Sequence, residues 1–100
     1  MEKYKESPDI VSFIDSEHSK LTIEFAFVRI EKENINLTIY ENGCSLFAPG
    51  EDSDYTAVLS FCCPVKPSEA KARYKDGYLT VEVPFRDPIK GAVKVPIEED

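Results

Sequence analysis

Apolar and polar residues alternate along much of the chain, with the period of two that half-buried β-strands show. In the run 21–27 every odd-numbered position is apolar, and positions 22 and 24 are polar. The runs 35–40 and 55–63 repeat this pattern. Counting 10–14 as an opening strand, we expect at least seven strands and at most two short helical turns, a profile typical of a β-sandwich.

Turn-forming residues separate these runs. Asn42-Gly43 and Asp76-Gly77 each stand between two strand-like segments, which predicts two hairpins, the first over 35–48. The strand that follows Asp76-Gly77 is expected to end at Pro84. Because prolines interrupt the segment 64–70, we expect one short turn at 67–70 and no long helix there.

The segment from Ala72 to Leu79 has the form A-x-x-x-(N/D)-G-x-L and precedes a strand ending in proline. It resembles the closing hairpin of the alpha-crystallin domain, the core of the small heat-shock proteins. The stretch E-K-E-N-I-N-L-T-I also fits the acidic turn and following strand of that family, and the resemblance covers roughly residues 9–97. It implies an all-β, immunoglobulin-like antiparallel β-sandwich of about 7–9 strands and a binding protein rather than an enzyme.

Three features depart from the family pattern. The Pro-Gly that usually follows the opening strands is missing in 25–35, and the strand 57–61 lacks the usual arginine. Where many members insert a long loop with a strand that swaps into the partner, this chain has only 50–54, which is too short to swap. A dimer would then pair edge strands, and a monomer like the related CS-domain co-chaperones is the alternative.

The expected organisation is a short N-terminal arm (1–8), an alpha-crystallin-like sandwich (9–85) and a C-terminal extension (86–100). Within the extension, Val95-Pro96-Ile97 matches the tail motif I/V-x-I/V of the family. The resemblance implies that Val95 and Ile97 dock into a groove of a neighbouring subunit by strand addition. The groove would be edged by Leu37, Ile39, Lys71, Ala72 and Arg73. The alternative is that residues 93–97 form a last strand packed on their own domain.

Composition narrows the class of function. A chain of 100 residues is the size of one domain, and 12 basic against 19 acidic residues give a net charge of -7. With no evident cluster of Lys and Arg along the sequence, we expect no nucleic-acid partner. No apolar stretch is long enough to span a bilayer, and Cys44, Cys62 and Cys63 are read as thiols, so a cytoplasmic, membrane-free protein is expected.

The sequence offers little for catalysis. Neither a serine nor a cysteine has a histidine in any recognisable arrangement, the four glycines stand at apparent turns, and the cysteines lack the spacing of a zinc site. We therefore expect no enzyme, no cofactor and no metal, and interpret the cysteines as small buried side chains.

Two hypotheses of function follow. The first is an ATP-independent holdase that binds partly unfolded proteins through apolar grooves and self-associates into dimers or small oligomers. The alternative is a CS-type module that binds one defined partner. A redox-sensitive adaptor using Cys62 or Cys63 is a third, weaker hypothesis.

Overall fold

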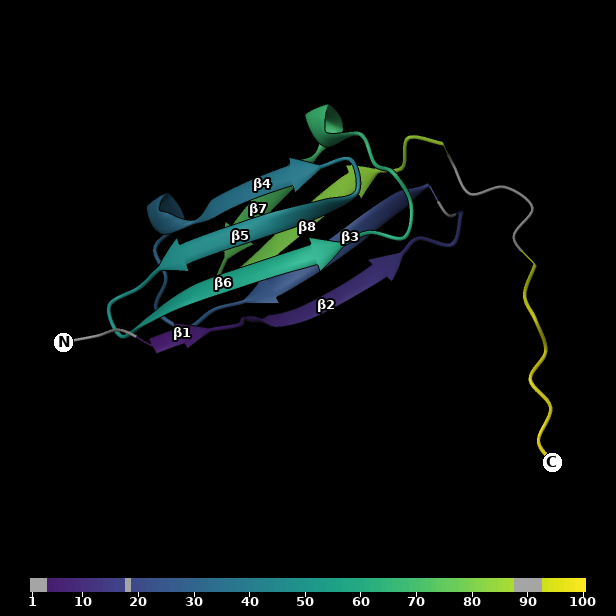
Figure 1. The fold of residues 1–100 in the computed structure, drawn as a ribbon, viewed down its shortest axis with the longest axis horizontal. Helices are drawn as coiled ribbons and strands as arrows, with labels where there is room; N and C mark the ends of the chain where they lie inside the picture. Colours follow the sequence, from purple (N-terminus) through teal and green to yellow (C-terminus); the bar gives the residue numbers. More distant parts are fainter. Residues whose placement is uncertain (1–3, 18, 88–92) are drawn as a thin grey trace.

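A computed structural model describes residues 4–17, 19–87 and 93–100. Two four-stranded sheets pack face to face (Figure 1). Sheet A has the order β1-β6-β5-β4, and sheet B has the order β2-β3-β8-β7. The strands are β1 (Tyr4–Glu6), β2 (Asp9–Ile14), β3 (Lys20–Ala26), β4 (Asn36–Tyr40), β5 (Gly43–Pro49), β6 (Ser53–Ser60), β7 (Lys71–Lys75) and β8 (Tyr78–Pro84), with 3-10 turns at Lys32–Asn34 and Pro67–Glu69. The all-β sandwich and the short turn near 67–70 are therefore confirmed.

The ends of two predicted segments differ from expectation. The first strand is β1, which lies in the stretch expected to be an arm and pairs in parallel with the start of β6. The strand predicted over 55–63 ends at Ser60. The main-chain N–H of Phe61 donates to the carbonyl of Asn42 (2.8 Å). That bond extends the register of β5 and β6 by one residue, after which the chain leaves the sheet and Cys62 and Cys63 lie in a loop.

The apolar positions predicted from alternation form the core between the sheets. Phe25 is 0% exposed, and its ring stacks on Phe27 with the centroids 6.4 Å apart. The ring of Tyr55 meets Phe27 edge-on, at 5.2 Å, and joins sheet A to sheet B. Fully buried side chains on strand β8 and just beyond it complete the centre: Val81, Val83 and Phe85.

The two predicted hairpins exist, but glycine acts differently in each. Asp76 and Gly77 have φ values of 51° and 84°, which are the left-handed angles of the expected tight turn. In the other hairpin, neither Asn42 nor Gly43 is among the described residues with positive φ. Gly43 is instead required by close approach of the next strand, because a Cβ there would overlap the carbonyl oxygen of Leu59.

The connection between β2 and β3 is closed by one carboxylate. Asp15 accepts hydrogen bonds from the Ser19 hydroxyl (2.6 Å), the Ser19 N–H (2.7 Å) and the Lys20 N–H (3.0 Å). The hydroxyl bond and the bond from Lys20 hold the pKa of Asp15 below its ordinary value of 3.8. The ionised form therefore stabilises the folded turn.

The contribution of Asp15 should depend on pH. Because the pKa is lowered on folding, the stabilisation is complete above 3.8 and is lost as the pH falls through the folded-state value. We expect Asp15→Asn to be less stable than the parent at neutral pH and the gap to narrow in acid, measured by urea unfolding at each pH. Glu17→Gln, at an exposed neighbouring position, should keep the parental pH profile. Parallel profiles for Asp15→Asn and the parent would contradict this role.

Candidate docking site

Strand β4 is one edge strand of sheet A and β7 is one edge strand of sheet B, and the two lie at the same side of the sandwich (Figure 1). On β4, Leu37 is the register partner of buried Leu46, and Ile39 is the partner of buried Cys44. Since residues that are directly opposite share a face, Leu37 and Ile39 point between the sheets. Both are half-buried and pack against the core.

On β7, the inward residues are Ala72 and Tyr74, whose register partners Val81 and Leu79 are buried. Ala72 nevertheless stays exposed, so solvent reaches the inward face of β7 at this residue. The Tyr74 hydroxyl donates to the carbonyl of Ile30 (2.8 Å), and burial raises the pKa of this phenol. We call the edge formed by the inward residues Leu37, Ile39, Ala72 and Tyr74 the β4–β7 groove.

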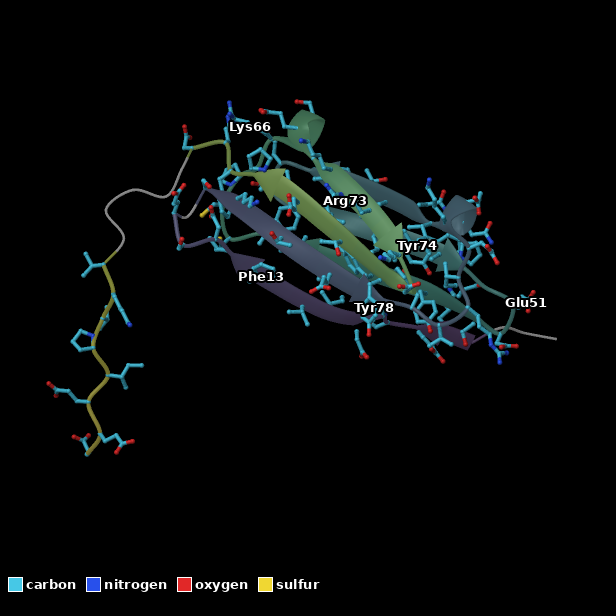
Figure 2. All side chains as sticks on the ribbon, turned by 180° about the vertical axis from the view of Figure 1, so that it is seen from behind. Phe13, Glu51, Lys66, Arg73, Tyr74 and Tyr78 are labelled. Atoms are coloured by element: carbon cyan, nitrogen blue, oxygen red, sulfur yellow. The ribbon has the colours of Figure 1, made fainter. Side chains whose placement is uncertain are left out.

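The other two residues assigned to the groove, Lys71 and Arg73, point away from it. They alternate with Ala72 and Tyr74 and so lie on the outer face of sheet B, together with Lys75. Figure 2 looks onto sheet B and labels Arg73 on β7. We call Lys71, Arg73 and Lys75 the basic strip. It borders a depression of about 320 Å³ whose remaining lining residues are Tyr78, Thr80 and Glu82. The sequence concealed this cluster because each cation is separated from the next by one residue.

The C-terminal tail makes no strand over residues 93–100. Val93, Val95 and Ile97 are all exposed, Ile97 by 93%. A last strand packed on its own domain is therefore not what the structure contains. Part of the linker expected before the tail, 88–92, lies outside the described residues.

A second apolar groove lies at the opposite side of the sandwich, and sequence reasoning missed it. It has a volume of about 440 Å³ and lies between β2 and β3 of sheet B and the end of β6. Ile14, Leu59 and Phe61 are among its lining residues, and Ile14, the register partner of buried Leu21, is 37% exposed. The sequence did contain a signal. In β2, Ile10 and Val11 are adjacent apolar residues, as are Phe13 and Ile14, so both faces of this strand carry apolar side chains. We call this opening the β2–β6 groove.

The cysteines are not all buried, which corrects one expectation. Cys44 is buried, and burial raises the pKa of its thiol. Cys62 is exposed, and a hydrogen bond between the two thiols, together with partial burial, raises the pKa of Cys63. Thiols with a raised pKa are poor nucleophiles, so this geometry gives the redox hypothesis no support at Cys63.

Other kinds of site receive no support from the residues that can be described. His18 lies outside them. Within 4–17, 19–87 and 93–100, no group of three or more His, Cys, Asp or Glu side chains is placed to hold a metal ion. The same ranges contain no helix with the length and apolar character needed to cross a membrane.

The chain has the fold of the alpha-crystallin domain of small heat-shock proteins: two packed four-stranded sheets, with β4 and β7 at edges and a closing Asp76-Gly77 hairpin. Heat shock protein 16.0 from Schizosaccharomyces pombe superposes with a TM-score of 0.75 at 11% identity, covering 92% of this chain and 98% of the other. HSP18.5 from E. histolytica superposes with a TM-score of 0.72 at 14% identity, covering 95% of this chain and 100% of the other. A small heat shock protein from Synechococcus phage S-ShM2 superposes with a TM-score of 0.62 at 14% identity, covering 91% of this chain and 98% of the other.

At these identities the likeness is one of fold. No family model matches the sequence, and no curated protein matches it. The fold predicted from residues 72–84 is thus confirmed by the structural comparison, although the sequences have diverged to 11–14% identity.

Proposed function

We propose that this chain is an ATP-independent holdase of the small heat-shock type. The observation that carries the proposal is the open β2–β6 groove, an apolar surface on a domain whose structural neighbours are named as heat shock proteins. Exposed apolar surface of this kind binds the apolar segments that a partly unfolded protein releases. The net charge of -7 keeps such a complex in solution.

The proposal includes self-association through the extension 86–100. Val95 and Ile97 are exposed, stand two residues apart and belong to a segment without secondary structure. An extended segment of this form adds to an edge strand through its main chain while alternate side chains enter a groove. Leu37, Ile39 and Ala72 supply apolar groove walls on a second copy.

Aggregation of reduced insulin, followed by light scattering without ATP, tests the holdase activity. We expect the full chain to suppress scattering and Ile14→Ser to suppress it less, because Ile14 is the register partner of buried Leu21 and the substitution replaces an apolar wall of the β2–β6 groove. Val28→Ser is the control, since Val28 is also an exposed apolar residue but lies outside this groove. No suppression by the parent, or equal activity of both variants, would count against the proposal.

A CS-type module that binds one defined partner is the second candidate. The observation that favours it is the connection between β5 and β6, which has only Gly50, Glu51 and Asp52 and cannot carry a swapped strand. A monomer by light scattering at all concentrations, together with no effect on insulin aggregation, would favour this candidate. Assembly that Val95→Asp/Ile97→Asp abolishes would favour the holdase.

A further inference from the structure

We propose that the basic strip on β7 is the receiving surface for the acidic end of the tail, Glu98-Glu99-Asp100, of a second copy of this chain. The inference rests on the proposed docking of Val95 and Ile97 in the β4–β7 groove. It adds a second contact, on the opposite face of the same edge strand. That contact gives the docked tail one direction and makes assembly sensitive to salt.

The first argument is the period of the two segments. If the tail adds to the free edge of β7, alternate side chains point to opposite faces of the extended sheet. Val95 and Ile97 then point into the groove, on the face of Ala72. Glu98 and Asp100 point to the other face, which is the face of Lys71 and Arg73.

The second argument is the direction of the added strand. Lys75 and Tyr78 flank a two-residue turn and therefore form a hydrogen-bonded pair, so the main-chain groups of Ala72 and Tyr74 face the free edge. An antiparallel tail would bond to them through Val95 and Ile97, and Pro96, which has no N–H, would point away from β7. A parallel tail would turn Pro96 towards β7 and lose a hydrogen bond.

In the antiparallel direction the chain of the tail runs from the Lys75 end of β7 towards the Lys71 end. In this register Glu98 lies opposite Lys71 with Arg73 as its diagonal neighbour, and Asp100 lies just beyond the Lys71 end of β7. Three independent features therefore bring the acidic end of the tail to the basic strip. They are the position of Pro96, the alternation in β7 and the acidic residues that follow Ile97.

The third argument is charge. No salt bridge or side-chain hydrogen bond joins Lys71, Arg73 or Lys75 to another described residue. Glu82 is the one acidic residue that lines the depression, and its carboxylate forms a salt bridge with the amine of Lys20 at 3.7 Å. Two copies of a chain with net charge -7 repel one another, so contact is least opposed where a basic surface meets the acidic tail.

Light scattering of the full chain over a concentration series tests the inference. We expect Glu98→Lys/Asp100→Lys to raise the concentration needed for assembly by about tenfold, as two exposed ion pairs would. Lys71→Glu/Arg73→Glu should have a similar effect, and combining the four substitutions should restore most of the assembly. Raising the salt concentration should weaken the assembly of the parent more than the assembly of either charge variant.

Lys5→Glu, on β1 at the far edge, is the control for a change of net charge and should leave assembly nearly unchanged. The tail variant changes only exposed residues outside every strand, so its result does not depend on correct folding of an altered strand. If both charge variants assemble like the parent while Val95→Asp/Ile97→Asp does not assemble, the basic strip is not a receiving surface and the proposed docking stands. If Val95→Asp/Ile97→Asp also assembles like the parent, or the parent does not assemble, tail docking itself is overturned.

Discussion

Replacing Phe25 with alanine is expected to lower the free energy of unfolding by about 3–5 kcal/mol. Phe25 has no exposed surface, and its ring lies between the two sheets against Phe27. Alanine would leave a cavity that the flanking strands cannot fill without moving, because β3 is paired on both sides. Since domains of this size are stable by only about 5–15 kcal/mol, urea unfolding followed by circular dichroism should show a much lower midpoint.

Phe47→Ala provides the matched comparison. Phe47 is on the neighbouring sheet, but it points to the outer face and is 45% exposed. Its removal should lower the free energy of unfolding by much less, since water already covers part of the ring. Equal losses for the two variants would mean that Phe25 is not at the centre of the core.

Gly43→Ala is expected to have the second large effect, a loss of about 1–3 kcal/mol or more. The added Cβ would overlap the main-chain carbonyl of Leu59 on β6, which has no side-chain freedom with which to move away. β5 and β6 would have to separate at this point, and β4 is attached to the rest of sheet A only through β5. The variant should therefore unfold at lower urea and also weaken tail docking at the β4–β7 groove.

Asn42→Ala tests whether the effect belongs to the close approach or to the turn. Asn42 is exposed and adjacent to Gly43 in the hairpin. Without positive φ at either residue, the turn makes no special demand on Asn42, so its replacement should change the urea midpoint little. A loss as large as that of Gly43→Ala would show that the turn, and not the contact with β6, requires glycine.

The strands that could be predicted are those with one buried face. In β3 and β8 the alternation of apolar and polar residues records the burial directly, and the Asp76-Gly77 turn has the angles that its residues favour. β1 could not be predicted, because Tyr-Lys-Glu has no apolar alternation. It is held by parallel main-chain pairing with β6, and such pairing leaves no pattern in the sequence.

The candidate site was predicted only in part, and through a resemblance. The motif of Val95 and Ile97 and the strands of the groove came from that resemblance, and their docking stays a prediction. Which face each β7 residue occupies required the register with β8, because alternation alone does not say whether Ala72 or Arg73 points inward. The β2–β6 groove required the tertiary structure, since residues 59–62 form one wall and lie far along the chain from the walls at 10–14 and 21–23.

The pairing of β3 with β8 has a consequence for the synthesis of this chain. β3 leaves the ribosome early and pairs with β2, but its other neighbour is the last strand of the sandwich. Until residues 78–84 have been made, Leu21, Ile23 and Phe25 lack the strand that completes their sheet. A nascent chain with such an unpaired, apolar strand is prone to aggregation. During its own translation, this protein would therefore expose the kind of surface that we propose it protects in others.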